Sequence, residues 1–165
     1  SMMYELAAHT AALLPRERPR HLLGVGSPED LVECVKRGVD LFDCALPTRV
    51  ARNGAVFTRS GRVNIDIARF RGEPGPVEEG CDCYTCRHFS VGYLNHLFRA
   101  REILGLRLAT IHNLRFIVRL MEGMRRAIVE GTFASFAEQF LRQYQPANEE
   151  QRLQQHARRM TLRHN

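Results

Sequence analysis

Apolar side chains change their spacing several times along the chain, and these changes mark the expected elements. Residues 2–14 carry them at helical spacing, and Pro15 ends that helix. A short apolar run over 21–26 closes on glycines and predicts a buried strand. A second apolar run over 39–46 ends at Pro47 and predicts another strand.

The segment between these runs predicts a helix. Ser27 is the N-cap, Pro28 lies in the first turn, and Gly38 follows the last turn near Arg37. Strand, helix and strand with short links form a βαβ unit, which implies a parallel sheet. The compact spacing is typical of a barrel of βα repeats.

Turn signals at 53–54 and 60–61 flank two further runs, 55–58 and 62–67, which predict a small antiparallel excursion. A loop rich in proline and glycine, 72–80, then leads into a group of cysteines.

Three helices are expected after the cysteines. Ser90 caps the first, which runs to about Leu104 and stops at Gly105. The apolar pattern predicts a longer helix over 111–130 and a third over 133–144.

Composition indicates a packed, positively charged protein. The chain has 165 residues, of which 44% are hydrophobic, with 24 basic and 18 acidic side chains. Lys36 is the one lysine. Arginine suits phosphate and base edges, so the charge fits either a nucleic-acid partner or a solubilising surface. The polar end, 146–165, predicts a frayed helix or a disordered tail.

We expect a cytoplasmic protein, and in such a protein the cysteine pattern favours metal binding. No apolar run reaches the roughly 20 residues of a membrane helix, and 2–14 lacks the features of a signal peptide. Three of the five cysteines fall within six residues, which favours metal binding over disulfides. Cys34 and Cys44 stand apart, and we expect them to pack in the core.

The segment 81–86 places three thiols in one loop, and a two-residue gap lets two sulfurs reach the same tetrahedral zinc ion. His112 is the best candidate for a fourth ligand, because it begins a helix that could pack back on the loop. His96 is the alternative, whereas His88 is too near the last cysteine. Four protein ligands leave no open position, so the site is expected to be structural, with one Zn²⁺ per chain. The expected ligands are Cys81, Cys83, Cys86 and His112.

Asp43 is a charged residue inside the second apolar run, where it must be paired or used. Functional groups of βα barrels gather at the carboxyl ends of strands. Asp43 could therefore be a nucleophile, a general base or a buried ion-pair partner of Arg49 or Arg52. The spacing alone slightly favours the ion pair.

Several motifs in order resemble the C-terminal half of the bacterial tRNA-guanine transglycosylases, also called queuine tRNA-ribosyltransferases. The match runs from about Tyr4 to Phe140. The motifs are GVGSPEDL at 24–31, GVDLFDC at 38–44, PTR at 47–49, ARNG at 51–54, CDCYTC at 81–86 and TIHNL at 110–114.

The resemblance implies an α/β fold: the C-terminal portion of a (β/α)8 TIM-type barrel with an inserted zinc-binding subdomain and C-terminal helices. The implied regions are the last βα units over 1–50, the antiparallel excursion and zinc subdomain over 51–112, the helices over 113–145 and the tail over 146–165.

The resemblance also implies a function. Family members exchange guanine at the tRNA wobble position for a 7-deazaguanine base, on the route to queuosine. Asp43 matches the nucleophile, which attacks the ribose anomeric carbon and forms a covalent intermediate, as in retaining glycosidases. The bacterial likeness favours the aminomethyl precursor as the incoming base. His112 matches the fourth zinc ligand.

Four further positions correspond to family residues that bind substrate. Leu23 and Gly24 match the base pocket, and Arg49 and Arg52 match contacts to the flanking uridines, as suits arginine beside an extruded base. His21 stands where the family usually has a tyrosine.

A complete member is more than twice this length, and its N-terminal half carries most barrel strands and the second catalytic aspartate. Two strands cannot close a barrel, so we expect open sheet edges. The partner would be a separately supplied N-terminal half or further copies of the chain. The alternative function is a non-catalytic zinc-binding module for tRNA docking or dimerisation.

Overall fold

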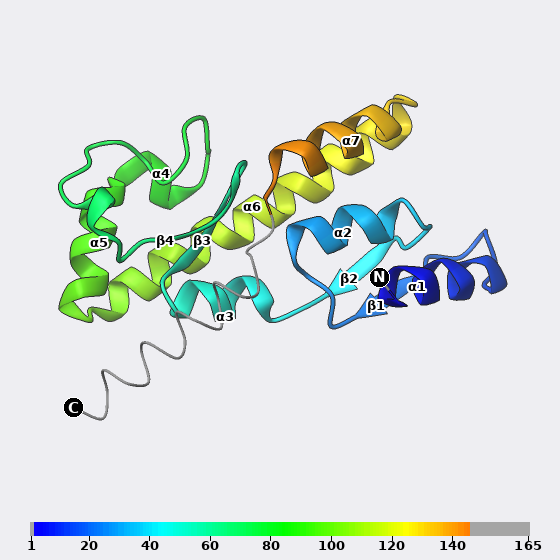
Figure 1. Cartoon of the computed structure of the whole chain (residues 1–165), viewed down its shortest axis with the longest axis horizontal. Helices are drawn as coiled ribbons and strands as arrows, with labels where there is room; N and C mark the ends of the chain where they lie inside the picture. The colour runs from blue at the N-terminus through cyan, green and yellow to red at the C-terminus, as the bar shows by residue number, and fades with distance from the viewer. Residues whose placement is uncertain (1, 146–165) are drawn as a thin grey trace.

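The computed structural model describes residues 2–145 and has a mixed α/β architecture (Figure 1). The expected tail, 146–165, lies outside the described residues. The elements in chain order are α1 (Met2–Leu13), β1 (His21–Leu23), α2 (Pro28–Val35), β2 (Leu41–Asp43), α3 (Leu46–Arg52), β3 (Ala55–Thr58), β4 (Gly61–Asn64), a 3-10 turn η1 (Ala68–Phe70), α4 (Tyr84–His88), α5 (Val91–Ala100), α6 (Ile103–Val129) and α7 (Phe133–Gln143).

The predicted βαβ unit is confirmed, but its first strand, predicted as buried over 21–26, spans only 21–23 and is not buried, since His21 and Leu23 are exposed. Strands β1 and β2 are parallel, with Leu23 opposite Asp43 at their carboxyl ends, and α2 connects them. The Ser27 hydroxyl accepts a hydrogen bond from the Asp30 amide, so Ser27 caps α2 as expected.

The second predicted strand is shorter than its apolar run. It ends at Asp43, and α3 begins at Leu46 with Pro47 in its first turn. Proline is tolerated there because the first helical amides need no partner within the helix. Pro47 therefore helps to start a helix that the sequence pattern did not predict.

The antiparallel excursion is confirmed as a hairpin. Thr58 pairs with Gly61 at its end, across a turn formed by Arg59 and Ser60. The second strand ends at Asn64, before the predicted limit of the run.

The boundary between the next two helices was predicted wrongly. Helix α5 ends at Ala100, where Arg101 adopts the left-handed conformation, and α6 begins at Ile103. Gly105 is buried inside α6, and a Cβ there would lie 3.0 Å from the Leu97 Cβ. This glycine permits close packing of α5 on α6 and does not end a helix.

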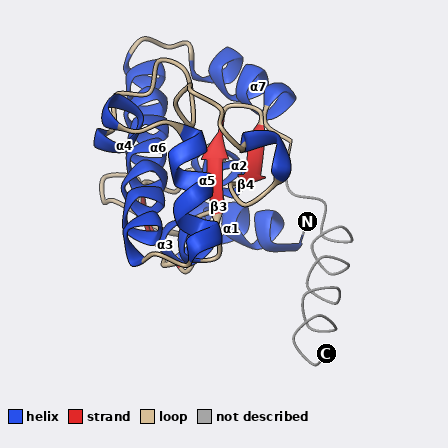
Figure 2. Ribbon diagram, turned by 90° about the vertical axis from the view of Figure 1, so that its left-hand side faces the viewer, coloured by secondary structure: helices blue, strands red, loops and turns tan. Residues whose placement is uncertain are grey.

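Helix α6, 27 residues long, is the axis of the molecule, and α2, α3, α4, α5, α7 and β3 all contact it. Figure 2 shows the hairpin strands among these helices. One buried cluster joins the hairpin to α5 and α6, and another joins α2, α6 and α7. Among the described helices, none is both long and apolar enough to span a membrane.

Candidate metal centre and strand-end site

Three sulfurs and one imidazole nitrogen converge between the cysteine loop and α6. The His112 Nδ1 atom lies 3.7 Å from the Cys81 Sγ atom, 3.6 Å from that of Cys83 and 3.3 Å from that of Cys86. Tetrahedral zinc, with bonds of about 2.3 Å to sulfur and about 2.0 Å to nitrogen, requires sulfur–nitrogen separations of about 3.6 Å. All four ligand atoms lie within 4.8 Å of one another, so the set fits one metal ion.

The cysteine loop is shaped by its own backbone and by a buried threonine. Cys83 is the N-cap of α4, and its sulfur accepts a hydrogen bond of 3.2 Å from the Cys86 amide. The buried Thr85 hydroxyl donates to the Leu108 carbonyl at 2.7 Å. The Thr85 contact holds α4 against α6, and the Cys83 contact fixes the turn of the loop that carries the sulfurs.

His112 is fully buried, and a neighbouring carbonyl fixes its tautomer. Its Nε2 atom lies 2.7 Å from the Phe57 oxygen, to which it donates, so Nδ1 faces the sulfurs. The adjacent Asn113 side chain accepts from the Phe57 amide and donates to the Pro47 and Ala55 carbonyls. One turn of α6 thus joins the cysteine loop to β3 and α3.

Hydrogen bonds among the thiols and the imidazole shift the pKa values of these groups in different directions. Hydrogen bonds from Cys83 and Cys86 lower the pKa of Cys81 far below its usual range. Hydrogen bonding to Cys81 and Cys83 raises the pKa of Cys86. Burial opposes charging of His112, but its hydrogen bonds to Cys81 and Cys83 prevail and raise its pKa to about 10. A divalent cation would replace the protons that remain on these groups and offset most of the thiolate charge.

The other two histidines considered as metal ligands lie outside this cluster. His96 is exposed on α5, and the ring of His88 packs on that of Tyr84 with 4.6 Å between centroids. The structure also corrects the expected position of His112, which lies well inside α6 and not at its start.

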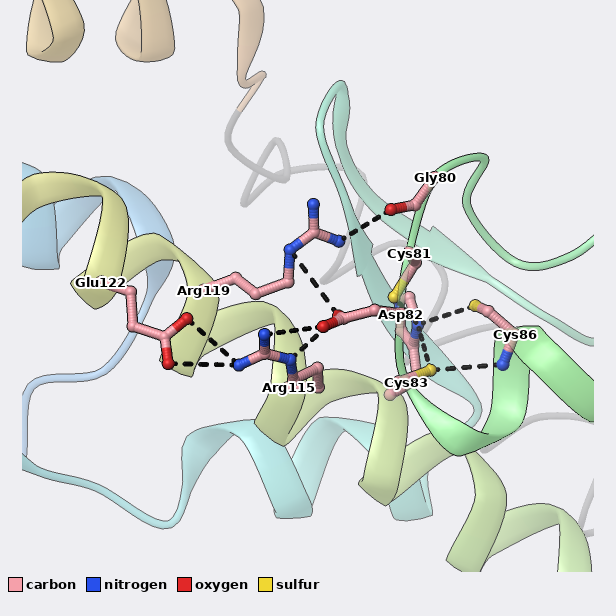
Figure 3. A network of polar contacts seen from close by, with 9 residues as sticks. Gly80, Cys81, Asp82, Cys83, Cys86, Arg115, Arg119 and Glu122 are labelled. Atoms are coloured by element: carbon pink, nitrogen blue, oxygen red, sulfur yellow. Dashed lines mark hydrogen bonds and ion pairs between the residues drawn. The ribbon is translucent and has the colours of Figure 1, made fainter. Parts of the chain in front are cut away.

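An outer network surrounds the cysteine loop and was not predicted (Figure 3). Arg115 donates to both carboxylate oxygens of Asp82, at 2.9 and 2.7 Å. Arg119 donates to the Gly80 carbonyl at 3.3 Å, and Glu122 accepts from Arg115 on the side away from Asp82. The signal in the sequence that could have indicated this network is that Arg115 lies about one helical turn after His112. That spacing predicts a contact with the cysteine loop only once α6 is known to pack against the loop.

Asp43 lies at the carboxyl end of β2, with its side chain 68% exposed. Its Oδ1 atom is 3.4 Å from the His21 Nε2 atom, and its carbonyl accepts from the Gly24 amide at 2.9 Å. Leu23, opposite Asp43 in the sheet, is 69% exposed. The structure therefore brings Leu23, Gly24 and Asp43 together at one open strand end.

The expected buried ion pair with Arg49 or Arg52 is wrong. Asp43 is exposed, and both arginines are exposed on α3 without an ion pair to it. The early start of α3 explains this, because a helix carries these side chains away from the strand end.

The isolated cysteines differ in burial. Cys34 is fully buried in α2, as expected. Cys44 is only partly buried at the strand end, where its sulfur lies 3.4 Å from the Gly24 carbonyl oxygen.

The fold contains a βαβ unit with an exposed carboxylate, and one long helix links this unit to a cluster of three cysteines and one histidine. These features define an α/β protein with a candidate structural metal centre. The model of the family described as queuine tRNA-ribosyltransferase matches residues 1–146. The chain belongs to this family.

Curated bacterial relatives agree with the family match. The chain is 52% identical over 160 residues to the queuine tRNA-ribosyltransferase of Dehalococcoides mccartyi, covering 97% of this chain and 41% of that protein. The protein of that name from Herpetosiphon aurantiacus is 56% identical over 143 residues, covering 87% and 36%. The one from Symbiobacterium thermophilum is 54% identical over 151 residues, covering 92% and 38%. The chain thus spans well under half the length of these relatives.

Proposed function

We propose that the chain forms part of a tRNA-guanine transglycosylase, a pentosyltransferase that exchanges guanine at the tRNA wobble position for a 7-deazaguanine base in queuosine biosynthesis. The observation that carries this proposal is the position of Asp43, exposed at the carboxyl end of a parallel strand. A tRNA substrate and a thiolate metal site both favour a cytoplasmic setting.

In the proposed reaction, an Asp43 carboxylate oxygen bonds to the ribose anomeric carbon as the bond to guanine breaks. Guanine takes up a proton at its ring nitrogen as it leaves. The aspartyl–ribose bond then breaks as the ring nitrogen of the incoming base gives up its proton and bonds to the same carbon. The acid–base group for both proton transfers would lie in the N-terminal half of the longer relatives. His21 lies close enough to orient the carboxylate.

Binding residues surround this strand end. Leu23 and Gly24 would line the base pocket, in keeping with their exposure beside Asp43. Arg49 and Arg52 would contact the uridines that flank the target, and their guanidinium groups have no ion pair with any described carboxylate.

The finer fold proposal treats β1 and β2 as the last strands of a (β/α)8 barrel. Both strands have one unpaired edge, since the described sheet contains only these two. The complementary strands would come from the segment that the longer relatives carry beyond the aligned region. The test of function therefore supplies that segment, from one relative, in trans.

The reconstituted protein should exchange labelled guanine into an anticodon stem-loop. Asp43→Asn should lose at least about a thousandfold in rate and form no denaturation-resistant RNA adduct, because an amide is a poor nucleophile. Asp40→Asn is the matched control: it lies beside the opposite end of β2, accepts from the Arg20 amide and should change the rate little. Equal exchange by wild type and Asp43→Asn would refute the nucleophile assignment.

The two-stranded sheet also favours a second candidate, a non-catalytic tRNA-docking or dimerisation module. This candidate predicts salt-dependent RNA binding or a dimer by size exclusion, with no exchange in the reconstituted wild type.

We infer further that the metal is a single structural zinc ion. Three sulfurs and one nitrogen suit zinc and leave no position for a substrate. His112→Ala should reduce bound zinc, measured by mass spectrometry after desalting, from about one equivalent to near none, while His96→Ala keeps it. Retention of a full equivalent by His112→Ala would contradict the assigned ligand.

A further inference from the structure

We propose that Arg115 is a positioning residue for the metal loop, which holds the Asp82 carboxylate and thereby the backbone that joins Cys81 to Cys83. This inference rests on the proposed zinc site and adds to it a determinant of how long the ion is retained.

The geometry of the Asp82–Arg115 pair is specific. The Nε and Nη2 atoms of Arg115 each donate to a different oxygen of Asp82, at 2.9 and 2.7 Å. Such a two-point contact fixes orientation as well as distance. Asp82 has one ligand on each side in the sequence, so holding its side chain restricts the backbone of both Cys81 and Cys83.

Helix α6 carries both the proposed metal ligand His112 and Arg115, the residue that holds Asp82. His112, Arg115, Arg119 and Glu122 are spaced by three, four and three residues, which places them along one face of α6. Figure 3 shows Arg115 between Asp82 and Glu122, with Arg119 reaching the Gly80 carbonyl. Because α6 is continuous here, the loop and His112 are held in one rigid frame.

The network adds no net charge beside the proposed metal site, because the carboxylates of Asp82 and Glu122 balance the guanidinium groups of Arg115 and Arg119. Glu122 in turn accepts two hydrogen bonds from Arg115, at 3.3 and 3.2 Å, and limits its movement.

The contribution of the Asp82–Arg115 pair to metal retention can be measured separately from its contribution to folding stability. The Arg115 and Asp82 side chains are 32% and 39% exposed, and partly exposed ion pairs add little to global stability. Groups that orient metal ligands nevertheless typically change metal affinity about 10- to 100-fold. We therefore expect substitutions of the pair to act on metal release much more than on unfolding.

The experiment loads the 165-residue chain with Co²⁺, whose absorption reports a tetrahedral sulfur–nitrogen site, and follows its release into excess chelator. Arg115→Gln and Asp82→Asn should each speed release about 10- to 100-fold, with Arg115→Lys in between. The double variant should accelerate release by less than the product of the two single effects, because both changes remove the Asp82–Arg115 contact, although each also removes a contact of its own, Arg115 to Glu122 and Asp82 to Arg119. Arg142→Gln, which breaks the exposed Arg142–Glu138 pair on α7, is the matched control and should leave release unchanged.

Release rates within twofold of wild type for both single variants would overturn the proposal, as would multiplicative effects in the double variant. Failure of wild type to bind one equivalent of Co²⁺ would overturn the metal site and this inference together, whereas normal binding with unchanged release overturns this inference alone. Should Arg115→Gln fail to fold by circular dichroism, the isosteric Asp82→Asn and charge-preserving Arg115→Lys variants decide the question.

Discussion

At the scale of single residues, the neutral side chain of Asn113 forms hydrogen bonds to three backbone groups of two other elements. It is fully buried, accepts from the Phe57 amide at 2.9 Å, and donates to the Pro47 and Ala55 carbonyls at 3.0 Å each. These partners lie at the start of α3 and along β3. Asn113 therefore stabilises the junction between the strand-end site and the metal centre.

Asn113→Ala should destabilise the protein by about 2–4 kcal/mol, because it leaves three buried backbone groups without their partner. Urea unfolding monitored by circular dichroism measures the change. Asn53→Ala is the control: this exposed side chain donates to the Arg49 carbonyl, and its loss should cost less than about 0.5 kcal/mol. Similar losses for both variants would contradict the role given to Asn113.

At the scale of elements, the N-cap of α2 is a feature that the sequence predicts and that also lies beside the strand-end site. Ser27 follows the glycine turn after β1, and its hydroxyl both accepts from the Asp30 amide and donates to the Asp30 carboxylate at 2.6 Å. Gly26 beside it is tightly packed, since a Cβ there would lie 2.5 Å from the Cys44 Cβ. The helix start thus fixes the loop between the two strand ends.

Ser27→Ala should lower the free energy of unfolding by about 1 kcal/mol, the usual effect of losing an N-cap. Ser135→Ala provides the comparison, since this exposed hydroxyl in α7 donates only to the Thr132 carbonyl and should contribute less than about 0.5 kcal/mol. Thermal unfolding compared at one pH tests both values, and an unchanged midpoint for Ser27→Ala would show that the cap is dispensable.

The elements that local signals predicted correctly have strong boundaries. Ser27 with Pro28, the hairpin turn at 59–60, one residue before the predicted turn signal, and Ser90 each specify a start or a turn through hydrogen bonds within a few residues. Pro47 and Gly105 were misread because each residue is compatible with both a helix end and a helix interior or start. Packing of α3 and α5 on α6 decided between these possibilities.

At the scale of the whole molecule, the metal ligands join segments that are far apart in the sequence. The cysteine loop and His112 are separated by α5, and His112 also bonds to Phe57 in the hairpin. A metal at this centre would therefore stabilise the packing of hairpin, α4 and α6 as one unit.

Removal of the metal should lower the melting temperature and be favoured by acid. With free metal at about a thousandfold its dissociation constant, binding adds about 4 kcal/mol, or roughly 10 °C for a chain of this size. The pKa of His112 is raised to about 10, so the metal-free ring is protonated at neutral pH. Binding must release that proton, and affinity should therefore fall at least tenfold for each pH unit lowered.

Calorimetric scans with and without chelator measure the first effect, and metal competition titrations at pH 8, 7 and 6 measure the second. His112→Ala is the reference that should show no chelator effect. A wild-type affinity independent of pH across this range would contradict the charge state assigned to His112.

The open side of the molecule lies around α1 and the small parallel sheet. A cavity of about 490 Å³ there is lined by apolar residues of α1 and β1, among them Met3 and Leu22. Leu41 on β2 is 51% exposed. Unpaired strand edges beside apolar surface fit the proposal that further βα units cover this side.

The sequence by itself determined the features that depend on neighbours in the chain: the βαβ unit, the hairpin, the three cysteines in one loop and an aspartate at a strand end. Their signals are local, because caps, turns and ligand spacing act over a few residues. Only the tertiary structure decided that α6 begins before Gly105, that Asp43 lies beside His21 and not Arg49, and that Arg115 holds Asp82. These outcomes depend on how α3, α4 and α5 pack on α6, which is set by contacts between residues distant in the chain.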